Sequence, residues 1–252
     1  MSPMKLITYL QKTKQVTRRE FAQMLKEQVL FVNELPVTSF DSGVSIGDKI
    51  KIVIKEGNYE ETIQYIPSSR PTIILFHKPV GYVVSKDDPH NRTIYDILPP
   101  RRKKDFWYIG RLDKESSGLL LLTNDPQLVD RYENPKQRIH KHYEVRLDMP
   151  FRQNHVKKMT QGMWIDADGY KTATEEGEFL QCVRCGTYKD TKGKPCLEIV
   201  LDAGKNRHIR RMLSALGYRV KALHRVKVGK RTLGDIKPGK RKIERVSKPS
   251  QR

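Results

Sequence analysis

Apolar positions at helical and at strand spacing divide the first part of this chain. Residues 4–12 place apolar side chains at helical spacing, and residues 17–20 form a capping box at the start of a second amphipathic helix. Short apolar runs at 30–33, 37–38 and 49–54 read as strands, with a turn at 45–48. A small unit of two helices and several strands is therefore predicted for residues 1–66.

The rest of the chain predicts a larger unit, which residues 67–72 join to the first as a Pro- and Ser-containing linker. Four successive leucines at 119–122 predict a strand that is buried on both faces. Further strands are predicted at 72–76, 141–147 and 196–201. Helices are predicted from Pro126 and over residues 206–217. Residues 150–195 show only short strand and turn patterns.

Positive charge is concentrated near the end of the chain. The formal charge is +20, and residues 204–252 carry 17 Lys and Arg against two acids. Such a skew indicates a polyanionic partner, whereas a merely solvated basic tail accounts only for the last few residues, 246–252. No apolar run approaches a membrane span and no signal peptide is recognisable, so we expect a soluble, cytoplasmic protein without a membrane partner.

The three cysteines do not predict a metal site. Cys182 and Cys185 form one Cys-x-x-Cys pair and Cys196 follows, but no histidine completes a second half-site. We interpret all three as reduced thiols and expect no metal.

The candidate chemistry lies in the loop before the four leucines. Arg111 and Asp113 stand two residues apart, at the mouth of the predicted buried strand. A loop held by a rigid element is a common place for a reactive side chain. The alternative is that Asp113 caps a turn and pairs with Arg111. A basic segment at 99–104 lies just upstream, and it is either solvated or guides a nucleic-acid backbone.

Three arginines occupy the first turn of the helix predicted at 206–217. Arg207, Arg210 and Arg211 lie near the positive end of the helix dipole, where cations are unfavourable. A compensating anion is therefore expected, either a phosphate or a carboxylate.

The whole string Gly-Arg-Leu-Asp-x-x-Ser-x-Gly followed by Leu119–Leu122 and Thr-Asn-Asp resembles the catalytic signature of the pseudouridine synthases. The likeness is to the RsuA-type enzymes, which modify ribosomal RNA. Ser116 stands where that family usually has Thr. The resemblance implies that Asp113 is the essential catalytic residue.

Three other segments extend the resemblance over residues 73–244. His77 to Ser85 is similar to the first family motif, in which Lys78 either reaches phosphate or is a solvated side chain in a structural turn. Lys141-His142-Tyr143 is similar to the second, which implies that Tyr143 stacks on the base and accepts a proton. On periodicity alone Tyr143 is a core aromatic. Ile209-Arg210 is similar to the third, which implies that Arg210 contacts the catalytic carboxylate.

The resemblance implies an α+β pseudouridine synthase fold for residues 73–245, with a large, mostly antiparallel mixed sheet flanked by helices. Residues 1–66 resemble the S4-like RNA-binding domain. The implied partner is RNA, most of all ribosomal RNA, bound by a monomer without a cofactor. The implied substrate-binding residues are Arg111, Ile209, Lys78, Lys141, Arg207, Arg211, Arg225, Arg18 and Arg19.

Two other functions compete with this interpretation. A glycosidase-like hydrolase would cleave the same bond, with Glu115 as its second carboxylate. An inactive RNA-binding or ribosome-assembly protein would keep the domain without the reaction. The sequence leaves open which uridine and which ribosomal subunit are modified, and whether Asp113 attacks C1′ or C6 or removes the C2′ proton.

Overall fold

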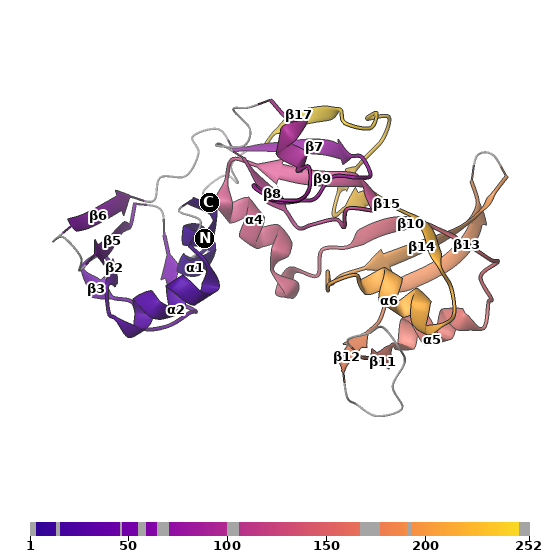
Figure 1. Ribbon diagram of the computed structural model, residues 1–252, viewed down its shortest axis with the longest axis horizontal. Coiled ribbons are helices and arrows are strands. Elements are labelled where there is room, and N and C mark those ends of the chain that lie inside the picture. Colours follow the sequence, from indigo (N-terminus) through magenta and orange to yellow (C-terminus); the bar gives the residue numbers. More distant parts are fainter. Residues whose placement is uncertain are drawn as a thin grey trace, which may run out of the picture. The chain divides into compact units, whose positions relative to one another are not determined.

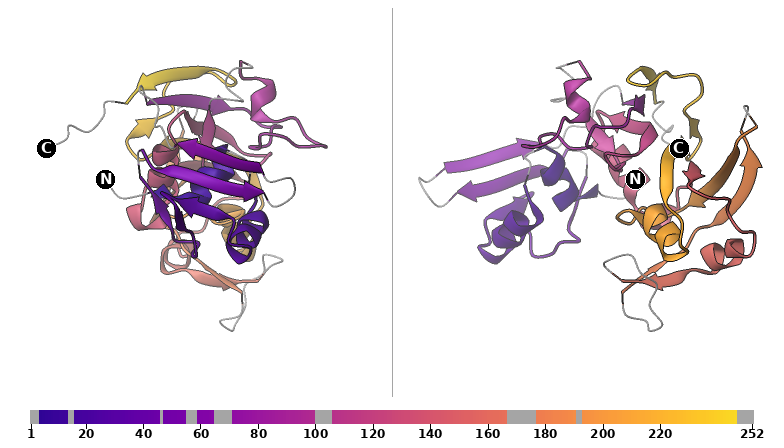
Figure 2. Two further views of the ribbon diagram at one scale, coloured as in Figure 1. Left: turned by 90° about the vertical axis from the view of Figure 1, so that its left-hand side faces the viewer. Right: turned by 45° about the vertical axis from the view of Figure 1, so that its right-hand side comes forward.

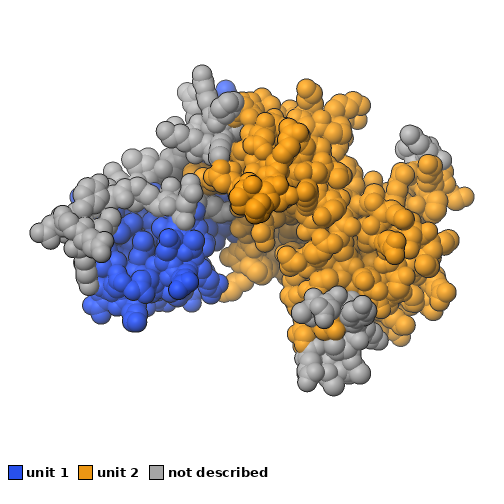
Figure 3. Space-filling view, viewed as in Figure 1, with its two compact units in different colours: residues 1–72, 123–131, 245–252 blue, residues 73–122, 132–244 orange. Residues whose placement is uncertain are grey.

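The computed structural model describes residues 4–13, 16–45, 47–54, 59–64, 71–99, 106–166, 177–190 and 193–246. The chain divides into two compact units, coloured separately in Figure 3. Unit 1 comprises residues 1–72, 123–131 and 245–252, and unit 2 comprises residues 73–122 and 132–244. Residues 100–104 of the basic segment at 99–104, most of the linker and the tail from 247 lie outside the described residues.

Unit 1 packs two helices against short strands (Figure 2). The helices are α1 (Leu6–Thr13) and α2 (Arg18–Lys26), and the predicted capping box at Thr17 and Glu20 is confirmed. One sheet has the order β3-β2-β5-β6, with β2 Leu30–Val32, β3 Leu35–Pro36, β5 Lys49–Ile54 and β6 Tyr59–Gln64. A second pairs β1 (Met4–Lys5) with β4 (Gly43–Val44). That unit 1 is an S4-type domain stays a prediction.

The strand predicted at 37–38 is wrong by two residues. Asn33 and Glu34 have φ of 50° and 65°, and these left-handed positions make a tight turn between β2 and β3. Because the turn is so short, β3 already begins at Leu35 and spans Leu35–Pro36. The Val37 N–H still donates to the Leu30 carbonyl at 2.8 Å, and the Val37 side chain is buried.

Unit 2 is built on a nine-stranded mixed sheet, which confirms the predicted α+β class. Its order is β13-β14-β10-β15-β9-β7-β17, with β16 beside β15 and β8 beside β9. Strands β9 and β15 run parallel, whereas β10, β14, β13 and β15 pair antiparallel. The bounds are β7 Thr72–Lys78, β8 Trp107–Ile109, β9 Ser117–Thr123, β10 Lys141–Leu147, β13 Arg184–Lys189, β14 Pro195–Leu201, β15 Val220–Val228, β16 Arg231–Thr232 and β17 Arg241–Arg245.

Helices α5 (His155–Gln161) and α6 (His208–Ala215) lie on the same side of the β10, β14 and β13 end of this sheet (Figure 1). The predicted apolar face of α6 is confirmed, since Ile209, Met212 and Leu213 are buried. Helix α5 was not predicted, because Met159 is its only buried residue and its N-cap makes no side-chain hydrogen bond.

The remaining elements are α4 (Pro126–Glu133), the β11 (Met163–Ile165) and β12 (Glu178–Leu180) hairpin, and two short 3-10 helices at Ile94–Asp96 and Pro135–Gln137. Helix α4 begins where Asp125 caps it, as predicted, through a 2.9 Å hydrogen bond from the Gln127 N–H. None of the described helices is both long and apolar enough to cross a membrane.

A glycine brings strands β9 and β15 together. Gly118 pairs with Arg225 across the parallel contact, at a φ of 109°. A Cβ at Gly118 would lie 2.3 Å from the Arg225 carbonyl oxygen, so only glycine permits this approach. The contact fixes the start of β9 and, with it, the end of the loop that carries Asp113.

Candidate active site

The loop between β8 and β9 is held at both ends by hydrogen bonds. At its start, the Gly110 N–H donates to Glu133 Oε1 at 2.7 Å. At its end, the Ser116 N–H donates to the Asp113 carbonyl oxygen at 3.0 Å, which closes a turn. Asp113 thus sits on a short loop whose backbone has little freedom, directly before the buried strand β9.

Asp113 pairs with Arg210 of α6. Arg210 Nε lies 3.5 Å from Asp113 Oδ2, and the two side chains are 13% and 26% exposed. The same guanidinium donates to the Ser116 hydroxyl at 3.2 Å and to the Glu115 carbonyl at 3.3 Å. Arg210 therefore bridges α6 to the loop at three points, and the partial burial strengthens its attraction for the carboxylate.

Lys78 lies beneath the loop and is fully buried. Its Nζ donates to the carbonyl oxygens of Ser116 at 2.7 Å, Pro79 at 3.0 Å and Lys114 at 3.4 Å. Burial lowers the Lys78 pKa to about 8, although Asp113 and Glu115 favour its charged form. Neither sequence reading of Lys78 was right: it is too buried to reach a phosphate and is not solvated, because the loop carbonyls take all its donors.

Arg225 is also buried, at 2% exposure, and does not face solvent. Its Nε donates to the Leu119 carbonyl at 2.7 Å and its guanidinium to the Arg111 carbonyl at 3.4 Å. The expectation that Arg225 binds RNA directly is therefore wrong, because its contacts tie β15 to strand β9 at Leu119 and to the Asp113 loop at Arg111. Arg225 acts on the site by holding that loop.

Tyr143 of β10 lies in register with Arg225 of β15 and Gly118 of β9. It pairs with Arg225, which in turn pairs with Gly118 of β9. At a strand spacing of about 4.8 Å, the Tyr143 and Gly118 backbones lie roughly 10 Å apart. The Tyr143 ring is 7% exposed and belongs to the same apolar cluster as Leu112 and Ile209. Tyr143 is therefore a core residue that also lies near the Asp113 loop.

The arginines at the start of α6 each have a carboxylate partner. Besides the Arg210–Asp113 pair, Arg207 lies 3.3 Å from Glu115 and Arg211 lies 2.5 Å from Glu178. The helix begins at His208, so Arg207 is its N-cap, in a left-handed conformation. The anions predicted beside this helix are therefore carboxylates in this structure.

Arg211 is turned toward the β11–β12 hairpin. Its guanidinium also donates to the carbonyls of Asp166 at 3.0 Å and Ile165 at 3.3 Å. These bonds hold the hairpin against α6, and the expected RNA contact of Arg211 stays a prediction.

The other predicted residues occupy varied positions. Ile209 is buried and Lys141 is half-buried, donating to the Ile139 carbonyl, and burial lowers the Lys141 pKa. Arg111 is exposed, and in the described structure it is Arg210 that forms the ion pair with Asp113. Arg18 and Arg19 are exposed at the start of α2 in unit 1.

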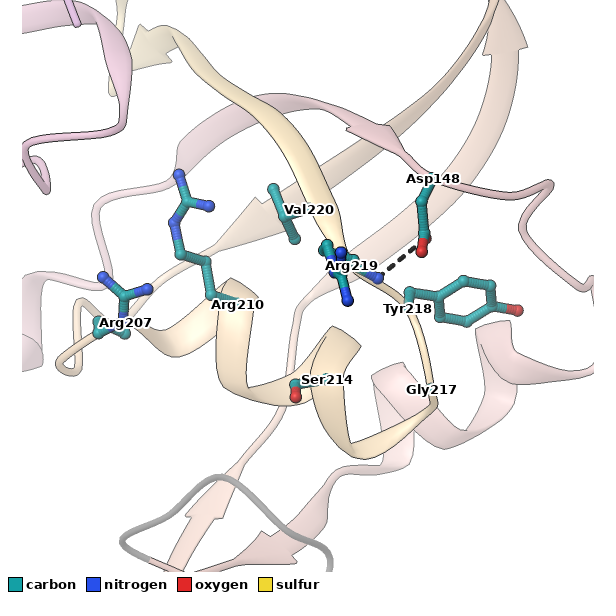
Figure 4. Close-up of a pocket in the computed structure, with 8 residues that line it drawn as sticks. All are labelled: Asp148, Arg207, Arg210, Ser214, Gly217, Tyr218, Arg219 and Val220. Carbon is teal, nitrogen blue, oxygen red and sulfur yellow. Dashed lines mark hydrogen bonds between the residues drawn. The ribbon is translucent and has the colours of Figure 1, made fainter.

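Arg210 also lines a cavity of about 520 Å³ beside α6 (Figure 4). It is lined by Asp148, Arg207, Arg210, Ser214, Gly217, Tyr218, Arg219 and Val220. The sequence analysis did not identify Arg219 and Ser214 as lining residues. It also missed the hydrogen bonds from Lys78 to the loop carbonyls. The only sequence signal for Arg219 is its place two residues after Gly217, which ends α6.

The arrangement is suited to chemistry by a single carboxylate. Asp113 is partly exposed and held by the Arg210 guanidinium, which also lines the basic cavity. Within the described residues, no three His, Cys, Asp or Glu side chains are grouped to hold a metal ion. The three cysteines are buried and form no disulfide in this structure.

Comparison with known proteins agrees with this geometry. The sequence profile of RNA pseudouridylate synthases matches residues 72–215, more than half of the chain. The chain is 31% identical over 170 residues to the ribosomal small subunit pseudouridine synthase A of Vibrio cholerae, covering 67% of this chain and 68% of that protein. It is 29% identical over 223 residues to the ribosomal large subunit pseudouridine synthase B of Xanthomonas campestris, covering 86% of this chain and 42% of that longer protein.

A crystal structure of a pseudouridylate synthase has the same fold, with a TM-score of 0.61 at 23% identity, over 97% of this chain and 96% of that one. The fold, the motifs and the sequence profile agree, and the chain belongs to the RNA pseudouridylate synthase family of isomerases, as its motifs predicted.

Proposed function

We propose that this protein converts a specific uridine of ribosomal RNA to pseudouridine, with Asp113 as the essential catalytic residue. The observation that carries the proposal is the Arg210–Asp113 pair at 3.5 Å, on a loop fixed by Lys78 and Arg225. The names of the relatives from Vibrio cholerae and Xanthomonas campestris support ribosomal RNA as the substrate and leave the subunit open.

The reaction exchanges one bond for another and consumes nothing. The C1′–N1 bond breaks, uracil turns within the site, and C1′ bonds to C5. The proton on C5 leaves and N1 gains one, so neither electrons nor a second substrate are needed. Asp113 begins this sequence by attacking C1′ or C6 or by removing the C2′ proton. Arg210 Nε, 3.5 Å from Asp113 Oδ2, holds in place the carboxylate that each of these routes uses.

The target base has to leave its RNA stack before Asp113 can reach the sugar. Such enzymes swing the nucleotide into a pocket, where apolar and aromatic side chains hold the base. We assign this contact to Tyr143 and Ile209, which share an apolar cluster with Leu112 of the loop. Tyr143 is also our candidate for the acceptor of the C5 proton.

The hydrolase alternative needs a protonated acid beside Asp113. A hydrogen bond from its own backbone N–H and the neighbouring Arg207 lower the pKa of Glu115, which is 57% exposed. An ionised, solvated carboxylate is a poor general acid. The inactive-binder alternative gives no reason for three buried or half-buried cations around one loop.

The test is tritium release from ribosomal RNA transcribed in vitro and labelled at uridine C5. We expect Asp113→Ala to abolish release while its RNA affinity stays within about twofold of wild type, because the carboxylate acts on the one reacting nucleoside and not on the phosphates that supply most of the affinity. The matched control is Asp235→Ala, which removes an exposed loop carboxylate and should retain full activity.

Activity of Asp113→Ala equal to wild type refutes the assignment of Asp113. Free uracil among the products supports the hydrolase. RNA that keeps its tritium after incubation with the wild-type protein supports the inactive RNA-binding protein. Mapping pseudouridines in cellular RNA with and without the protein then identifies the uridine.

A further inference from the structure

We propose that the cavity beside α6 binds a backbone phosphate of the target RNA, next to the nucleotide that enters the site, and that Arg219 is its principal contact. This inference deepens the proposed function and rests on RNA being the substrate. Figure 4 shows Arg207, Arg210 and Arg219 spaced along the cavity, with Ser214 on α6 between them.

The charges of the cavity lining favour an anion. Three arginines face one acid, Asp148, whose Oδ1 already accepts the Arg219 backbone N–H at 2.9 Å. Arg207 and Arg210 are paired with Glu115 and Asp113. In the described part of the chain, the Arg219 guanidinium is the one in this cavity that pairs with no carboxylate.

The chemistry of the lining selects phosphate over a base or an apolar group. A guanidinium presents a planar fork of donors that matches two phosphate oxygens. The exposed hydroxyl of Ser214 adds a donor on the neighbouring turn of α6. Tyr218 is buried at 4% exposure, so its ring offers no open face for stacking.

The position of the cavity selects a phosphate of the substrate strand. Arg210 lines the cavity and also contacts Asp113, so the two sites are continuous through one side chain. A uridine whose C1′ meets Asp113 carries a phosphate on each side of its ribose. One of these is expected to enter the cavity, and the reactive ring then faces the carboxylate.

The alternative role of Arg219 is to stabilise α6, because a cation just beyond the C-terminus of a helix interacts favourably with the helix dipole. That role affects stability, and it does not depend on the RNA backbone. Binding to charged and to neutral backbones therefore separates the two explanations.

The experiment measures the affinity of the full chain for a short oligouridylate and for the same sequence with neutral methylphosphonate linkages. We expect Arg219→Gln to weaken binding of the charged strand by about tenfold or more and to reduce the slope of log K against log salt by about one. Both proteins should bind the neutral strand equally. Ser214→Glu keeps Arg219 but adds a negative charge to the cavity, and it should weaken the charged strand similarly.

The control is Arg184→Gln, which removes an exposed arginine of β13 that pairs with Glu198. Loss of affinity in Arg219→Gln no larger than in this control, or equally large with the neutral strand, overturns the proposal. Arg219-dependent binding by a wild-type protein that releases no tritium from ribosomal RNA supports the phosphate site while refuting the proposed reaction.

Discussion

Replacement of Gly118 by alanine tests how the active-site loop is anchored. Gly118 is the second residue of β9 and has a φ of 109°, and an added Cβ would lie 2.3 Å from the oxygen and 2.5 Å from the nitrogen of Arg225. Both neighbours are backbone atoms, so no side-chain rotation relieves the overlap. The strands must separate at the point where the loop of Asp113 ends.

The cost has two parts. The backbone conformation costs an alanine about 1–2 kcal/mol. Separation of β9 from β15 also weakens the charged hydrogen bond from Arg225 to the Leu119 carbonyl, worth about 1.5–3 kcal/mol. The total of about 3–5 kcal/mol should lower Tm by roughly 6–20 °C in a chain of this size, and a displaced loop should also reduce turnover.

Thermal unfolding and tritium release measure the two effects. The control is Gly234→Ala, at a φ of 53° with nothing within 4 Å of the added carbon, so it carries only the backbone cost. If the two variants lose the same Tm and the same activity, the close approach of β9 and β15 does not anchor the site.

Two further predictions concern Lys78 and Tyr143. Because the folded-state pKa of Lys78 is lowered from 10.5 to about 8, the unfolded chain binds more protons between these values. The free energy of unfolding should therefore gain about 3 kcal/mol from this group as pH rises from 8 to 10.5. Urea titrations of the wild-type protein and of Lys78→Met across that pH range measure this gain, which the variant should lack. Equal pH dependence of the free energy of unfolding in the two proteins contradicts the lowered pKa of Lys78. Tyr143→Phe keeps the buried ring and removes only the hydroxyl, so Tm and RNA affinity should stay near wild type while tritium release is lost. Full activity of Tyr143→Phe would leave the residue a purely apolar role.

The sequence predicted local structure wherever a pattern was complete. The four leucines at 119–122 are all fully buried, because the strand they form is covered on both faces. The Thr17 capping box and the Asp125 cap also formed as expected, since their partners lie within three residues. Family motifs added the large sheet, which no local pattern displays.

Contacts between distant segments were not predictable in the same way. Lys78 meets carbonyls that lie up to 38 residues further along the chain, so its burial depends on the finished sheet. Arg225 follows the Leu119 carbonyl by 106 residues. The sequence indicated that the arginines at the start of α6 needed anions, yet the choice of Glu115 and Glu178 depends on where the loop and the hairpin fold.

Strand β17 is the edge strand of the large sheet, beside the apolar strand β7. It pairs with β7, in which every residue from Ile73 to Lys78 is buried, and its own side chains are mostly charged and exposed. Without β17, the hydrogen-bonding groups of an apolar strand would be open to any other chain, which is a common origin of aggregation. The exposed charged residues of β17 therefore oppose pairing of this sheet edge with another chain, and a truncation before Arg241 should aggregate.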